Sequence, residues 1–98
     1  MSRPIIFRPL AKAELDEAIH WYEKQKAGLG LDLRVAVEQM LIRMADAPER
    51  FRAVRGEVRR ALLQRFPYAI HFLPEPKAII VVAVFHTKRD PRRLEGRG

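Results

Sequence analysis

One histidine and several arginines in the second half of the chain are of the types that cleave RNA without a metal ion. Such cleavage needs a base for the ribose 2′-proton, an acid for the leaving oxygen, and cations for the charge on the phosphoryl oxygens. His86 can transfer protons, and Arg59, Arg65 and Arg89 can stabilise the charge. A histidine at the end of a strand, with arginines on neighbouring strands, would be held rigidly enough for this chemistry.

His86 also has two readings without catalysis. A histidine at a strand end can hydrogen-bond locally, and Asp90 is a candidate partner for it. It can instead contact a partner protein together with the cations around it, and we favour these two roles over catalysis. The candidate residues for target or partner binding are Arg59, Arg60, Arg65, His86, Lys88, Arg89, Arg92 and Arg93.

The positive charge is concentrated in the second half of the chain. Residues 1–49 carry 7 Lys/Arg and 8 Asp/Glu, a net charge of −1, whereas residues 50–98 carry 12 and 4, a net charge of +8. This asymmetry favours an anionic partner, such as nucleic acid or an acidic protein segment. The alternative is an arginine-rich surface that serves solubility alone.

Cysteine is absent from the sequence, which excludes disulfides, thiolate zinc sites and thiol nucleophiles. His20 and His71 have no carboxylate cluster near them in sequence, so we expect no metal site and no cofactor. The N-terminus lacks the apolar core of a secretion signal, and the longest apolar run, residues 78–85, is too short for a membrane helix. We therefore expect a soluble cytoplasmic protein without membrane contact.

The first half of the sequence predicts a short strand followed by two helices. Residues 4–7 are apolar and include two β-branched isoleucines, and Pro9 can open a helix at its first turn. Apolar residues then recur at helical spacing up to Tyr22, and Gly28 supplies a C-terminal stop. A second helical stripe runs from Leu33 to Met44. Because the connection is so short, the helices form an antiparallel hairpin whose two stripes cover one surface.

The second half predicts three antiparallel strands. Residues 49–56 form a polar connector, and residues 58–63, 68–73 and 78–86 are the strands. In the middle strand Tyr68, Ile70 and Phe72 alternate with Ala69, His71 and Leu73, which places the two sets on opposite faces. The fold class is therefore α+β, with an N-terminal strand, a helical hairpin and a three-stranded antiparallel meander. Residues 1–98 form one domain, and residues 92–98 have the composition of a flexible basic tail.

The ordered set of motifs resembles the RelE/ParE superfamily of toxins from bacterial toxin–antitoxin modules. The resemblance extends from Pro4 to about Pro91, nearly the whole chain. The WYE…GLG form of the first helix is closer to the ParE branch than to the ribosome-dependent RNases. The motifs are AKAELDEAIHWYEKQKAGLG, Val58-Arg59, Arg65-Phe66-Pro67-Tyr68, and Val84-Phe85-His86 followed by Arg89-Asp90-Pro91.

The resemblance implies a helical hairpin packed on a small, strongly curved antiparallel sheet, in agreement with the order of elements above. It implies a hetero-oligomer with a cognate antitoxin, whose C-terminal segment wraps the toxin. ParE-like members poison DNA gyrase, and this branch implies a binding protein without an active site of its own. The candidate antitoxin contacts are Trp21, Tyr22, Arg65 and Tyr68.

The alternative branch implies a metal-independent endoribonuclease that cleaves messenger RNA on the ribosome. Arg65 and His86 fall where RNase members carry an arginine and a histidine that act on RNA. The aromatic hydroxyl that often follows the histidine in those members is Thr87 here, so a catalytic donor is missing. A third hypothesis is a member that has lost toxicity and is retained as an antitoxin-binding partner or as a component of a repressor.

Overall fold

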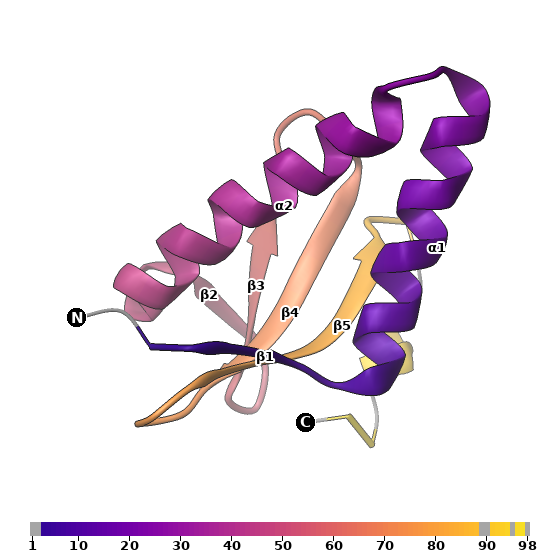
Figure 1. Ribbon diagram of the computed structural model, residues 1–98. Helices are drawn as coiled ribbons and strands as arrows, with labels where there is room; N and C mark the ends of the chain where they lie inside the picture. The colour runs from indigo at the N-terminus through magenta and orange to yellow at the C-terminus, as the bar shows by residue number, and fades with distance from the viewer. Residues whose placement is uncertain (1–2, 89–90, 95, 98) are drawn as a thin grey trace.

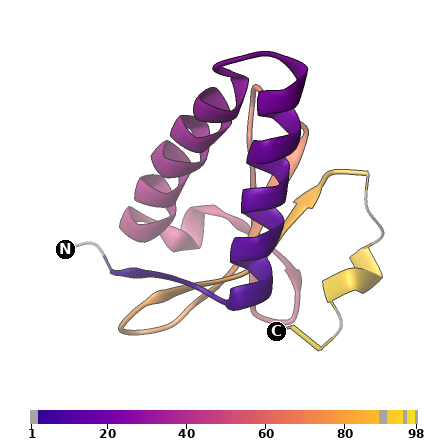
Figure 2. The same cartoon turned by 45° about the vertical axis from the view of Figure 1, so that its right-hand side comes forward.

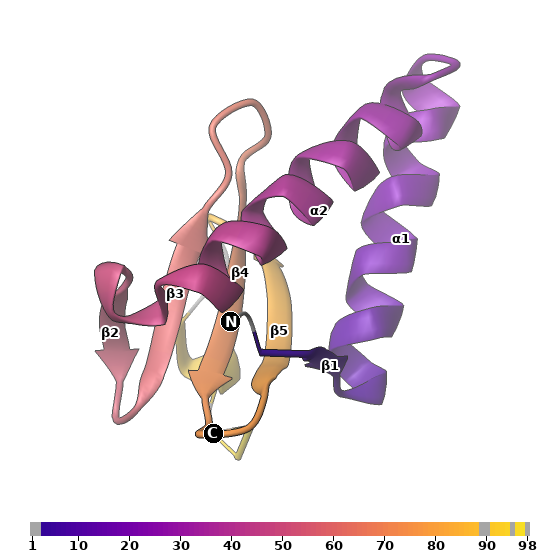
Figure 3. The same cartoon turned by 60° about the vertical axis from the view of Figure 1, so that its left-hand side comes forward.

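The computed structural model describes residues 3–88, 91–94, 96 and 97. In these residues the chain forms an α+β fold in which two helices cover one face of a five-stranded mixed sheet (Figures 1 and 3). The predicted fold class is confirmed. The elements are β1 (Ile5–Phe7), α1 (Pro9–Gln25), α2 (Leu29–Asp46), η1 (Pro48–Arg50), β2 (Arg52–Arg55), β3 (Val58–Leu62), β4 (Tyr68–Pro74), β5 (Ile79–His86) and η2 (Pro91–Leu94).

The strands follow the order β1-β5-β4-β3-β2, so β5 lies between β1 and β4. β2, β3, β4 and β5 are joined antiparallel, whereas β1 pairs with β5 in parallel. That parallel pairing aligns β1 with Ile79 to Val81 of β5. The second half of β5 is therefore bordered by β4 on one side and, within the described residues, by no strand on the other.

The prediction that residues 49–56 form only a connector is wrong, because these residues contain the strand β2. Arg52 pairs with Arg60 and Ala53 with Arg59, which adds a fifth strand to the sheet. All four residues of β2 are exposed. An exposed strand carries no apolar alternation, so only its backbone pairing with β3 reveals it.

The sheet has two buried faces. On the helix-covered face the core contains Ile70 and Phe72 of β4 together with Leu33 and Met44 of α2. The opposite face, called the far face below, contains a smaller cluster of Val58, Val82, Ala83, Phe85 and Leu94. Leu94 belongs to η2, which lies on the far side of β5 from the helices (Figure 2). The predicted alternation of β4 is confirmed, because the Tyr68 set packs with the helices.

A β-bulge changes the phase of β5 in its middle. His71 pairs with Ala83 and Phe72 with Val81, so Val82 is an extra residue in β5. Before the bulge Val81 belongs to the helix-side core, and after it Val84 does. Because the extra residue shifts the alternation by one, the end of β5 presents even-numbered residues to the helices.

The turn between the helices depends on Gly30 and Glu23. Gly28 has a φ of 90° and is the N-cap residue of α2, while α1 already ends at Gln25. The Glu23 carboxylate accepts hydrogen bonds from the backbone N–H groups of Gly28 (2.9 Å) and Gly30 (3.0 Å), groups that a helix start leaves without partners. A Cβ on Gly30 would lie 2.8 Å from the carbonyl oxygen of Ile19, so glycine permits the close approach of α1 and α2.

In the described part of the chain no helix has the length and apolar character to span a membrane. The helical hairpin was predicted from the spacing of apolar residues, and Figure 1 shows α1 and α2 joined by one tight turn at the top of the view.

Gly30→Ala should destabilise the fold by about 1–3 kcal/mol, because the new methyl group meets the backbone carbonyl oxygen of Ile19 as well as the Glu23 side chain that caps the turn. The measurement is urea unfolding followed by circular dichroism. Gly56→Asn is the control, since Gly56 has a φ of 56° with open space around it and asparagine tolerates that conformation. Equal stability of Gly30→Ala and the parent chain would contradict the close-approach argument.

Candidate functional site

His86 lies at the end of β5, facing α1. Its ring packs against that of Tyr68 in an edge-to-face arrangement with centroids 5.4 Å apart. Its Nδ1 accepts a hydrogen bond of 3.1 Å from the backbone N–H of Lys88. The lone pair of Nδ1 is therefore engaged within the chain in this geometry.

Arg59 and Arg60 point to opposite faces of β3, as the alternation of a strand requires. Arg59 donates a hydrogen bond of 2.5 Å from Nη1 to the carbonyl of Phe51, on the helix side. Arg59 is aligned with Phe72, while His86 is aligned with Tyr68. Four residues along β4 correspond to roughly 13 Å at about 3.3 Å per residue, so Arg59 and His86 do not meet.

Arg65 lies in the connection between β3 and β4 and faces α2. Its Nη2 is 3.5 Å from Oδ2 of Asp32, and its guanidinium lies 5.4 Å from the centre of the Phe66 ring. The arginine and histidine that the resemblance assigns to RNA chemistry are thus engaged with different neighbours.

The remaining candidate cations follow the end of β5 in the sequence. Lys88 and Arg92 are exposed, and Arg92 makes a further interaction within the structure. Arg89 and Asp90 lie outside the described residues, as does the side chain of Arg93. The proposed roles of these residues, and the pairing of His86 with Asp90, stay predictions.

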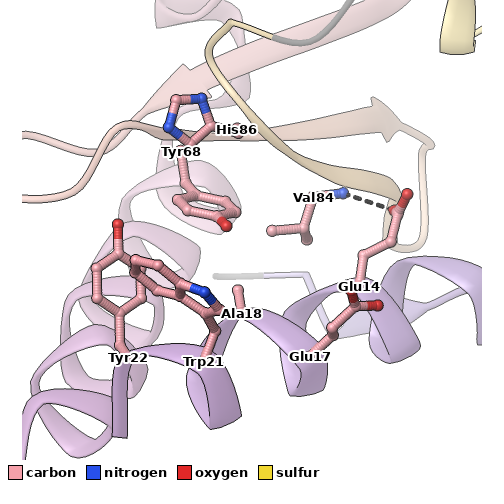
Figure 4. A pocket seen from close by; sticks show the side chains of 8 residues that line it. All are labelled: Glu14, Glu17, Ala18, Trp21, Tyr22, Tyr68, Val84 and His86. Carbon is pink, nitrogen blue, oxygen red and sulfur yellow. Dashed lines mark hydrogen bonds between the residues drawn. The ribbon is translucent and has the colours of Figure 1, made fainter. Parts of the chain in front are cut away.

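Three of the four predicted antitoxin contacts line one cavity of about 350 Å³ between α1 and β5. Trp21, Tyr22 and Tyr68 form a continuous aromatic wall with His86, in which neighbouring rings are 4.9 to 6.1 Å apart. Figure 4 shows the rings on one side of the cavity and two carboxylates on the other. We name this hollow the aromatic cavity; its lining is Glu14, Glu17, Ala18, Trp21, Tyr22, Tyr68, Val84 and His86.

Trp21 and Tyr22 occupy the positions that helical phase predicts. Tyr22 is half-buried, packs against the core, and has its pKa raised by burial. Trp21 is 54% exposed at the margin of the cavity. The spacing of Glu14, Glu17, Ala18 and Trp21 (i, i+3, i+4, i+7) places all four on one side of α1, a signal that sequence reasoning left unused.

Glu14 connects α1, β5 and the C-terminal segment. Its Oε1 accepts a hydrogen bond of 3.1 Å from the backbone N–H of Val84, on the unpaired edge of β5. The same oxygen accepts one of 2.8 Å from Nη1 of Arg97, and both side chains are under 20% exposed. Arg97 also stacks on the Phe85 ring at 4.8 Å and reaches the Val82 carbonyl at 3.4 Å. The clasp formed by Glu14, Val84 and Arg97 closes the open edge of β5.

His71 is buried on the far face, where its ring is tilted against Phe85 at 5.3 Å. Its Nδ1 has no hydrogen-bond partner. Burial, helped by the positive charge of Arg60, lowers the pKa of His71 to about 4. In the described residues no group of three His, Asp or Glu side chains is arranged to hold a metal ion.

Breaking the clasp should destabilise the fold. Glu14→Gln and Arg97→Met should each lower the free energy of unfolding by about 1–3 kcal/mol, with a coupling energy of similar size in the double variant. The exposed pair Lys12–Asp16, with an N–O distance of 3.2 Å, is the matched control and should couple by less than about 0.5 kcal/mol. Urea unfolding measures both cycles; additive effects at Glu14 and Arg97 would contradict the clasp.

The stability of the fold should depend on the protonation of His71. Its pKa is about 4 in the folded chain and about 6.5 in the unfolded chain, so the unfolded state binds the extra proton between these values. The His71 contribution is therefore complete above about pH 6.5 and is lost as the pH falls toward 4. The difference between the parent chain and His71→Leu, followed by urea unfolding across this range, isolates the effect. Parallel pH profiles would contradict it.

No curated protein matches the sequence significantly. A solved structure described as "Chromosomal ParDE TA system from P. aeruginosa" matches the fold with a TM-score of 0.75 at 16% sequence identity, covering 87% of this chain and 96% of that one. Residues 5–91 match the family described as "ParE toxin of type II toxin-antitoxin system, parDE". With nearly the whole chain matched in sequence and the fold in agreement, the chain belongs to the ParE toxin family.

Proposed function

We propose that the chain is a toxin that inhibits DNA gyrase by binding it in the cytoplasm and that a cognate antitoxin neutralises it. The observation that carries the proposal is the family match over residues 5–91. The geometry supports binding over catalysis. His86 already uses its Nδ1, and Arg59 and Arg65 are engaged with Phe51 and Asp32.

A repulsive pair of arginines supports the assignment of a target surface. Arg52 and Arg60 are direct cross-strand partners on β2 and β3, and both are exposed. Like charges directly opposite each other destabilise a sheet unless an anionic group lies between them. In the described part of the chain no acidic side chain forms an ion pair with either arginine. An acidic surface of the target would relieve this repulsion, and Arg52 was missed because its segment was read as a connector.

The antitoxin has apolar surface available to cover. Trp21 is exposed beside the aromatic cavity. Three apolar residues of α2, Leu31, Val35 and Ile42, are between 42% and 63% exposed and lie along one side of the helix. An antitoxin segment that covers these residues would form the expected hetero-oligomer and remove apolar surface from water.

The endoribonuclease alternative retains one supporting feature. The Tyr68 ring packs on His86, so the aromatic hydroxyl that is missing at position 87 has a substitute on the neighbouring strand. This alternative makes His86 indispensable, whereas the gyrase proposal does not.

Induction without the antitoxin should stop thymidine incorporation within minutes and leave early methionine incorporation intact.

Arg52→Glu combined with Arg60→Glu should reduce inhibition of gyrase supercoiling by purified protein at least ten-fold, because it reverses the charge of the proposed target surface. His86→Ala should keep full activity. Lys24→Glu combined with Lys77→Glu is the matched control, since both lysines are exposed elsewhere.

An early stop in methionine incorporation, together with loss of toxicity in His86→Ala, would overturn the gyrase proposal in favour of the RNase alternative. Co-expression of the antitoxin should restore both incorporations in either case.

A further inference from the structure

The aromatic cavity differs chemically from the rest of the molecule. The chain carries a net charge of +7, yet the charged side chains that line this hollow are the carboxylates Glu14 and Glu17. The cavity floor is formed by Ala18 and Val84, which are 4% and 3% exposed. The hollow is thus a small apolar-bottomed site with aromatic and acidic walls.

The two carboxylates are not equivalent. Glu14 is occupied by the Val84 N–H and compensated by Arg97. Glu17 is exposed at the rim, and within the residues that the structure describes no cation forms an ion pair with it. A single negative charge is therefore available at the mouth of the cavity.

The aromatic wall faces this charge across the hollow. Figure 4 shows the rings of Trp21 and Tyr68 opposite Glu14 and Glu17, with Ala18 and Val84 between them. The electron-rich faces of tryptophan and tyrosine attract cations, and a guanidinium is planar, weakly hydrated and able to stack on such rings while it donates to a carboxylate. An ammonium group would match the charge but not the stacking.

We propose that the aromatic cavity binds the guanidinium group of an arginine side chain presented by a partner polypeptide. The guanidinium lies against Trp21 and Tyr68 and donates to Glu17, while its aliphatic stem covers Ala18 and Val84. The proposal deepens the antitoxin contact proposed above, since it rests on the same aromatic residues. The partner would thus carry an arginine at this contact, although the positive net charge of the toxin by itself favours acidic groups in a partner.

The test is a titration of the full-length chain, made by cell-free synthesis, with N-acetyl-arginine amide. Trp21 is the sole tryptophan, so its indole N–H gives one signal in a ¹H–¹⁵N correlation spectrum and reports from the cavity wall. The arginine probe should shift this signal saturably. N-acetyl-citrulline amide, which has the same shape without the charge, should bind at least about five-fold more weakly.

Glu17→Gln should weaken binding of the arginine probe by about three- to five-fold, as expected for a partly exposed ion pair. Glu38→Gln, the same change at an exposed position on α2, is the matched control and should bind as the parent does. Equal shifts with the citrulline probe, no saturable shift, or unchanged binding in Glu17→Gln would each overturn the proposal. Because the titration uses neither gyrase nor antitoxin, its result is independent of whether the proposed function holds.

Discussion

The fold depends on the burial of β5 on both faces of the sheet. Seven of its eight residues are apolar, and Ile79, Val81, Val82, Ala83, Val84 and Phe85 are at most 3% exposed. A strand buried in this way needs cover on each side, because neither face can be left to water. The helical hairpin covers one face, and Leu94 of η2 helps cover the other. Leu94 is thus part of the core on the far face.

The same strand has an edge that β1 leaves half open. β1 pairs only as far as Val81, so the backbone N–H of Val84 requires another partner. Glu14 supplies it, and Arg97 compensates the charge of that carboxylate. An inward-facing charge on an open strand edge also hinders edge-to-edge pairing with another chain. Glu14 therefore joins α1 to β5 and to Arg97, and its carboxylate also lines the aromatic cavity.

Charge divides the molecule into two surfaces of different chemistry. The β2–β3 ribbon carries the exposed arginines Arg52 and Arg60, and the side of α1 that faces β5 carries carboxylates and aromatic rings. Long-range attraction of an acidic target follows the net charge, but within a Debye length of about 8 Å the local groups decide what binds. A basic protein can in this way hold an arginine of a partner in one cavity while it presents arginines elsewhere.

The sequence by itself determined the order of the elements, the helical hairpin and the two faces of β4, since apolar periodicity records which side chains avoid water. It also carried the family motifs that the match over residues 5–91 bears out. It could not reveal β2, whose exposed residues pair only through the backbone. Nor could it predict which face His86 occupies. The bulge at Val82 shifts the alternation of β5 by one residue, so that the His86 ring lies against Tyr68 on the side of α1. The clasp of Glu14 and Arg97 joins residues 83 positions apart. Such contacts depend on how the helices pack on the sheet, and the local pattern of apolar residues does not determine them.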